Sequence, residues 1–166
     1  TQQAPVILWF RRDLRLADHR ALTAAVHSGR PVIPVFIYDP LTQSLGAAAK
    51  FRLSLSLAAL AADLAGLGSR LILRRGPALQ VLRELAAELG AREIHWSRLY
   101  DPASKQRDIE VKSALQDAGF AVKSHMGHVL FEPWTVQTQT GGFYRVFTPL
   151  WKNVRNLDLP ACLEAP

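Results

Sequence analysis

The chain contains 166 residues, of which 49% are hydrophobic and 20% are charged, a composition typical of a globular domain with a sizeable core. It has no apolar run near the roughly 18–20 residues of a membrane span, and its one cysteine, Cys162, excludes an internal disulfide framework and a cysteine-built zinc site. The formal net charge of +6 predicts attraction to phosphate, in nucleic acid or in an anionic cofactor, although dispersed arginines can also be ordinary solvated charges.

Short apolar runs alternate with longer helical segments from the start of the chain to residue 125. Five runs are predicted to be strands, at 5–10, 31–39, 69–76, 92–97 and 120–125. Four helices are predicted between them, at 19–29, 50–68, 77–90 and 101–119. The second helix is the clearest, because its leucines recur with the helical period. We expect Asp18 to cap the first helix and Asp101 to cap the fourth.

This alternation predicts the α/β class, with a doubly wound five-stranded parallel sheet in the order 3-2-1-4-5 and helices on both faces. Ligands bind such Rossmann-like sheets beyond the carboxyl ends of the strands, where the strand order reverses. That point lies between the first and fourth strands. The segments that leave these strands are RRDLR (11–15) and SRLYDP (97–102). We therefore predict that the two polar turns meet at one ligand crevice.

The RRDLR turn is the strongest polar signal in the sequence. Asp13 can hold one arginine side chain in a bidentate pair and leave the others free to bind an anion. The alternative is a salt-bridge cluster that only stabilises the turn. Arg107 and Asp108 are interpreted as charges on a solvated helix face.

The remaining chemical signals are weak. His95 lies inside a predicted strand and is interpreted as a core histidine, whereas His125 and His128 flank a glycine and are interpreted as structural or exposed. The sequence contains no G-x-G-x-x-G run after the first strand, no Walker loop and no histidine spacing typical of metal ligands. We therefore predict no catalytic residue and no metal site.

After residue 125 the strand–helix pattern ends. The segment 126–155 is rich in loop-forming and aromatic residues, with a short helix predicted near Pro149, and 156–166 is interpreted as the first stretch of a linker. The predicted domain organisation is therefore a ligand-binding α/β domain over 1–130, followed over 131–166 by an aromatic loop, a short helix and the start of a linker.

Several motifs together resemble the N-terminal domain of the DNA photolyase and cryptochrome family. In chain order they are LWFRRDLRLADHRAL, VIPVFIYDP, GAAAKFRLSLSLAAL, RDIEVKSAL, LFEPWTV and GGFYRVFTPLWK. The resemblance covers about residues 5–155, and the RRDLR and YRVFTPLWK runs are specific in combination. One departure is His19, where the family usually has asparagine, and we expect a helix start to tolerate it.

The resemblance implies the antenna-binding domain of a deoxyribodipyrimidine photolyase. Family members are two-domain flavoproteins whose larger, helical C-terminal domain holds FAD, binds UV-damaged DNA and splits pyrimidine dimers in light. The same domain of a cryptochrome-like blue-light photosensor is an alternative. A stand-alone nucleotide-binding module is a third, but RRDLR lacks the glycines that a phosphate-binding loop needs.

The resemblance also implies where an antenna chromophore would bind. Folate-binding relatives carry an Asn-Glu pair where this chain has Ala103 and Ser104, which favours a deazaflavin or flavin over methenyltetrahydrofolate. The residues matching a deazaflavin or flavin site are Phe10, Arg11, Asp13, Phe36, Tyr38, Gly46, Lys50, Arg52, Leu99 and Asp101. The GAAA run either leaves room for a flat ring or is only an unstrained helix start, and Lys50 could meet an anionic group.

The expected partners follow from the same resemblance. They are the protein's own C-terminal helical domain and, through the full-length protein, UV-damaged DNA. For residues 1–166 alone we expect no repair and at most weak, salt-sensitive DNA binding, because no groove-reading element is visible. We expect a monomer with no membrane contact, and a cytoplasmic location because TQQAP lacks the pattern of a secretory signal.

Overall fold

The structure, a computed structural model, describes residues 3–166. The chain divides into two compact units, one made of residues up to His128 together with Leu163–Pro166, and the other of Val129–Cys162. Among the described residues, none of the helices combines the length and apolar character that crossing a membrane requires.

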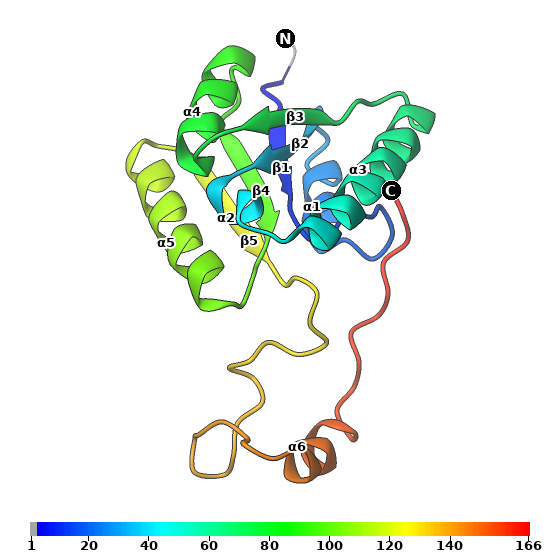
Figure 1. Cartoon of the computed structure of the whole chain (residues 1–166), viewed down its shortest axis with the longest axis vertical. Coiled ribbons are helices and arrows are strands. Elements are labelled where there is room, and N and C mark those ends of the chain that lie inside the picture. The colour runs from blue at the N-terminus through cyan, green and yellow to red at the C-terminus, as the bar shows by residue number, and fades with distance from the viewer. Residues whose placement is uncertain (1–2) are drawn as a thin grey trace. The chain divides into compact units, whose positions relative to one another are not determined.

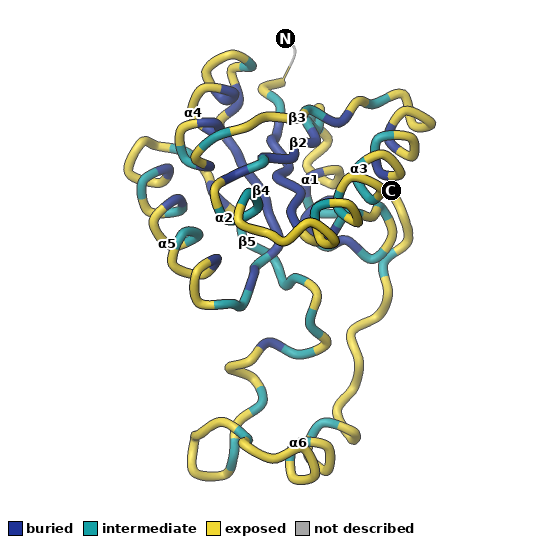
Figure 2. Tube along the Cα trace, viewed as in Figure 1, coloured by how far each residue is buried: buried dark blue, intermediate teal, exposed yellow. Residues whose placement is uncertain are grey.

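The first unit is built on a five-stranded sheet in which every neighbouring pair is parallel. The strands are β1 (Val6–Phe10), β2 (Val32–Tyr38), β3 (Ile72–Arg75), β4 (Glu93–Ser97) and β5 (Ala121–His125). Their order is β3-β2-β1-β4-β5, which confirms the prediction (Figure 1). The central strand, β1, is buried along its whole length (Figure 2), because it has a hydrogen-bonded neighbour on each side and helices over both faces.

In its described residues this unit has five helices: α1 (Arg20–Val26), α2 (Pro40–Gln43), α3 (Ala47–Gly66), α4 (Ala78–Leu89) and α5 (Pro102–Asp117). Helices α4 and α5 cover one face of the sheet, and α1 and α3 cover the other (Figure 1). Helix α2 is a single turn that has no counterpart among the predicted helices. It begins where Asp39 accepts a hydrogen bond from the backbone N–H of Thr42, with Pro40 in the first helical position.

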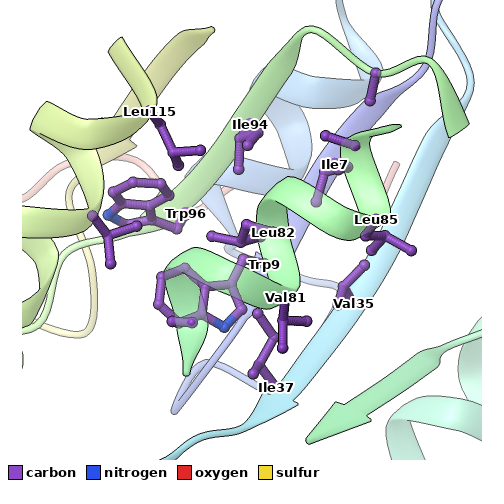
Figure 3. Close-up of a cluster of buried hydrophobic side chains, with 14 of the residues drawn as sticks. Ile7, Trp9, Val35, Ile37, Val81, Leu82, Leu85, Ile94, Trp96 and Leu115 are labelled. Carbon is purple, nitrogen blue, oxygen red and sulfur yellow. The ribbon is translucent and has the colours of Figure 1, made fainter. Parts of the chain in front are cut away.

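The core under α4 and α5 is centred on two tryptophans. Trp9 of β1 and Trp96 of β4 are register partners, and their rings meet edge to face with centroids 5.5 Å apart. Leu82 of α4 and Leu115 of α5 pack over them (Figure 3). The opposite core is smaller and includes Phe10.

Two predicted helix starts differ in the structure. The cap of α1 is His19, whose Nδ1 accepts a hydrogen bond from the N–H of Leu22, and not Asp18. Asp18 has a positive φ of 49°, and its N–H donates to the carbonyl of Leu163. Helix α3 begins three residues before the predicted 50 because Ala47 and the next two alanines are strong helix formers.

The second unit contains α6 (Phe147–Val154) and is otherwise without regular structure in the described residues. The rings of Phe147 and Trp151 stack one helical turn apart, with their planes 9° from parallel, and both side chains are exposed. The predicted short helix is therefore present, and it begins just before Pro149.

A line of polar side chains lies on the α1 side of the sheet. Nε2 of His95 is 2.7 Å from Oε1 of Glu93, and its Nδ1 is 3.3 Å from Nε2 of His125. The interpretation of His95 as a core histidine is confirmed, since only 1% of it is exposed. Glu93 also pairs with Arg30 and Lys123, so its charge is compensated from three directions.

This line of polar groups predicts a loss of stability in acid. Burial and the electrostatic effects of His95, Arg98 and Lys123 lower the pKa of His125 from 6.5 to about 4. Between these values the unfolded chain binds the proton and the folded chain does not, so stability falls as the pH drops from 6.5 to 4.

A second loss of stability, at lower pH, is expected from Glu93. Burial alone would raise its pKa, but Lys123, His95 and Arg30 outweigh burial and lower it from 4.5 to about 2. Its stabilising contribution is therefore complete above pH 4.5 and is lost as the pH falls toward 2. Urea denaturation at several pH values measures the free energy of unfolding over both pH ranges. His125→Asn should reduce the dependence of this free energy on pH only above pH 4.5, and an unchanged slope there would contradict the assignment to His125.

Candidate functional site

The turn after β1 is held together by a buried carboxylate. Asp13 accepts a hydrogen bond from the backbone N–H of Arg11 at 3.0 Å, and its Oδ2 is 2.8 Å from Nε2 of His19. Burial alone would raise the pKa of Asp13, but the hydrogen bonds from His19 and Ser97, the charge of His19 and the Arg11 N–H lower it well below the ordinary range. The prediction that Asp13 pairs with an arginine side chain is wrong, because its carboxylate contacts the backbone N–H of Arg11 and the ring of His19 instead.

The side chain of Arg11 is held by helix α5. Its Nη1 is 2.5 Å from Oδ2 of Asp108, and Nη2 of Arg107 is 2.8 Å from Oδ1 of the same carboxylate. Arg107 also pairs with Asp39 at the end of β2. The interpretation of Arg107 and Asp108 as solvated charges is therefore wrong. Helix periodicity could not show this, since the partners lie on other elements.

The two polar turns meet, as predicted. Nη1 of Arg12, after β1, is 3.0 Å from Oδ2 of Asp101, after β4. Asp101 also caps α5 by accepting the N–H of Ser104, which confirms its predicted role as a cap. Burial raises the pKa of Asp101, but the hydrogen bonds from Ser104 and the charge of Arg12 lower it overall.

Two guanidinium groups lie over the ring of Trp9. Cζ of Arg11 is 4.8 Å from the ring centroid and Cζ of Arg107 is 4.9 Å from it, within the range of cation–π attraction. Burial lowers the pKa of Arg11, and Asp108 partly compensates this effect. The result is a buried surface of guanidinium groups at the carboxyl end of β1, whose charges are paired with Asp108 and Asp39.

A small hollow opens beside this surface, at the carboxyl ends of β1, β2 and β4. It has a volume of about 80 Å³ and is lined by Trp9, Arg11, Arg12, Phe36, Ile37, Asp39, Leu41, Thr42, Leu45, Leu53, Leu99, Ser104 and Arg107. A second hollow of about 230 Å³ shares Asp39, Leu41 and Arg107 with the first. We call the first one the switch-point hollow, because it lies where the strand order reverses.

The structure brings three of the ten predicted ligand residues to this hollow: Arg11, Phe36 and Leu99. Asp13 and Asp101 support the turns that form it. The other five do not line it. Phe10 is buried in the opposite core, and the ring of Tyr38 lies 5.9 Å from Cζ of Arg75. Gly46 and Arg52 are exposed, and Lys50 is half-buried.

Sequence reasoning missed several lining residues. Asp39 and Thr42 follow the carboxyl end of β2, so the rule that located the crevice could have found them. Trp9 gave no such signal, because a large apolar residue in a buried strand is interpreted as core. Arg107 became visible only when α5 was placed against the sheet.

The lining chemistry fits a planar, anionic group. Trp9 and Phe36 offer aromatic surface and three arginines line the space. Nε and Nη2 of Arg11 are buried and have no hydrogen-bond partner among residues 3–166. The volume of about 80 Å³ is below the roughly 300–1,000 Å³ of typical ligand clefts. A tricyclic ring would therefore need more space than this. Movement of the lining side chains Leu41 or Leu45 would enlarge the hollow, and movement of the shared residues Leu41, Asp39 and Arg107 would join it to the second hollow.

Comparison with known proteins is consistent with this fold. The DNA photolyase family model matches residues 6–165. A deoxyribodipyrimidine photo-lyase from Agrobacterium fabrum is 47% identical over 95% of this chain, and Cryptochrome-2 from Arabidopsis thaliana is 35% identical over 96%. The chain spans 33% and 27% of the lengths of these two relatives.

Solved structures show the same similarity. A bacterial class III photolyase from Agrobacterium tumefaciens superposes on the whole chain with a TM-score of 0.94 at 44% identity, and the chain covers 35% of it. An archaeal photolyase from Sulfolobus tokodaii with two FAD molecules superposes on 96% of the chain with a TM-score of 0.79 at 28% identity, and the chain covers 36% of it. The chain therefore belongs to the DNA photolyase family, and its fold is that of the family's N-terminal α/β domain.

Proposed function

We propose that this chain is the light-harvesting domain of a DNA photolyase and that the switch-point hollow binds its antenna chromophore. The observation that carries the proposal is the pair of buried Arg11 donors that have no partner among the described residues, beside a hollow lined by aromatic rings and ion-paired arginines, at the point where such folds bind ligands. A bound chromophore would absorb light and pass the excitation to FAD in a helical domain.

The residues around the hollow would bind and orient the chromophore. Trp9 and Phe36 provide apolar surface, while Arg11, oriented by Asp108, provides hydrogen-bond donors and positive charge. Leu41 and Leu45 are the side chains that would exclude water from the bound group. No catalytic residue is proposed in this chain, because an antenna changes no bonds.

A deazaflavin or flavin is the favoured chromophore. The positions where folate-binding relatives carry Asn-Glu hold Ala103 and Ser104 here, and the N–H of Ser104 is already bonded to Asp101. The structure of the Sulfolobus tokodaii photolyase holds two FAD molecules and is described as implying a novel light-harvesting cofactor, which supports a flavin in this role. Methenyltetrahydrofolate is the alternative.

The site is tested by substituting Arg11 and Lys50. Arg11→Ala should weaken the binding of an anionic chromophore, measured as the absorbance that co-purifies with the protein, because Arg11 lines the hollow. Lys50 lies near the start of α3 and does not line the hollow, so Lys50→Ala should leave the occupancy unchanged. Unchanged occupancy in Arg11→Ala, or a loss only in Lys50→Ala, would place the site elsewhere.

For the whole protein we propose light-driven repair of UV-damaged DNA, with cyclobutane pyrimidine dimers as the substrate and FAD as the catalytic cofactor. The full-length protein should restore irradiated DNA in light and not in darkness. Equal repair in darkness, or none in light, would overturn the proposal. A photosensor is the second candidate, because plant cryptochromes are also similar to the chain. Residues 1–166 alone are expected to repair nothing.

The segment 131–166 is proposed to contact the helical domain, with 1–130 as the antenna-binding domain. The second unit contains an apolar hollow of about 700 Å³, and 11 of the 14 residues that line it are apolar, among them Leu150 and Trp151. Hydrogen exchange of α6 should therefore be slower in the full-length protein than in this chain. We also propose that the protein is monomeric and cytoplasmic.

A further inference from the structure

Three nitrogen donors beside the switch-point hollow are buried without a hydrogen-bond partner among residues 3–166. They are Nε and Nη2 of Arg11 and Nε1 of Trp9. Trp9 is 1% exposed and Arg11 is 6% exposed, so water does not reach these atoms from the surface. Buried donors are almost always paired, and an unpaired one costs free energy. Such atoms mark a place where a ligand supplies the acceptors.

The three donors belong to two residues that both line the hollow. Nη1 of Arg11 is held by Asp108 at 2.5 Å, and the guanidinium lies 4.8 Å from the centroid of the Trp9 ring, so its other nitrogens have fixed positions. The indole nitrogen of Trp9 lies at the edge of the ring nearer Ile37 (Figure 3). Trp9, Arg11 and Ile37 all line the hollow.

The carboxylate that lines the hollow does not neutralise these donors. Oδ1 of Asp39 accepts hydrogen bonds from the backbone N–H and the hydroxyl of Thr42, and Oδ2 pairs with Arg107. Asp39 is therefore fully engaged, while Arg11 and Trp9 keep free donors. The exposed Arg12, which pairs with Asp101, also lines the hollow.

We propose that Trp9 and Arg11 form a donor pair that binds two acceptor oxygens on the buried edge of the ligand. This inference rests on the proposed antenna site, and it makes Trp9 a ligand-contacting residue in addition to a core residue. The ligand class is a conjugated ring that carries carbonyl or carboxylate oxygens. Flavins present such oxygens on their dicarbonyl ring, and folates present them on the pterin carbonyl and the glutamate carboxylates.

The test replaces the Trp9 N–H without removing the ring. Benzothienylalanine carries sulfur in place of the indole N–H, so it keeps the packing against Trp96 and removes one donor. The probes are riboflavin 5'-phosphate and 5-formyltetrahydrofolate, both anionic, titrated into the chain and followed by fluorescence. The Kd of the probe that binds should rise about fivefold or more, whereas the Tm of the unliganded chain should stay equal or rise, because the lost donor had no partner.

The same replacement at Trp96 is the matched control. Trp96 is equally buried but does not line the hollow, so the Kd should stay unchanged. Arg11→Lys is the second variant, since it keeps a cation near Asp108 and removes Nε and Nη2, and it should also raise the Kd. The probe that responds identifies the source of the oxygens, either the flavin dicarbonyl edge or the folate oxygens.

Two results would overturn the inference in distinguishable ways. If a probe binds and the Trp9 replacement leaves its Kd unchanged, the donor pair is wrong and the antenna site stands. If neither probe binds the unsubstituted chain, the switch-point hollow is not the antenna site, and the inference fails with it.

Discussion

Replacing Asp108 with alanine is expected to lower the free energy of unfolding by about 3–5 kcal/mol, because the substitution leaves a buried charge without its partner. The side chain of Arg11 is 5% exposed, and Asp108 is its ion-pair partner at 2.5 Å. The same carboxylate also pairs with Arg107, so one substitution removes two contacts. Urea denaturation followed by circular dichroism measures the change.

An exposed ion pair provides the control for this substitution. Arg74 and Glu88 are 3.3 Å apart, with side chains 43% and 56% exposed, so Glu88→Ala should cost about 1 kcal/mol or less. A double variant, Arg11→Met with Asp108→Leu, should recover most of the stability lost by Asp108→Ala, because an apolar pair leaves no uncompensated charge. Equal losses for Asp108→Ala and Glu88→Ala would contradict the burial argument.

Replacing Trp96 with alanine is expected to cost about 3–5 kcal/mol, through lost burial and the cavity that remains. Trp96 is 1% exposed and belongs to the core formed with α4 and α5. Its ring packs edge to face against the ring of Trp9, with the centroids 5.5 Å apart. Neighbours on two rigid layers cannot collapse fully into the space of an indole ring. The expected result is a large fall in the urea midpoint.

The matched control is the same change at an exposed tryptophan. Trp151 is 50% exposed and belongs to the second unit, so Trp151→Ala should leave the unfolding of the α/β unit unchanged within about 0.5 kcal/mol. A loss at Trp96 no larger than the loss at Trp151 would show that the tryptophan pair does not stabilise the core.

The location of the site was predictable from the sequence, but the ion pairs within it were not. The rule that ligands bind at the reversal of strand order located the meeting of the turns, and the Arg12–Asp101 pair confirms that meeting. The partner of Arg11 was not predictable in this way. Asp108 lies 97 positions further along the chain, and its distance depends on how α5 crosses the sheet.

The sequence by itself determined the sheet, its strand order and the helices on both faces. These follow from apolar periodicity and from the handedness of parallel connections, which are local or nearly so. Only the tertiary structure decided which polar groups meet. It placed Trp9 on the wall of a hollow and directed Asp13 to His19, and it left Gly46 outside that wall. Periodicity shows which face of an element is buried, whereas the pairing of charges requires the distances between elements.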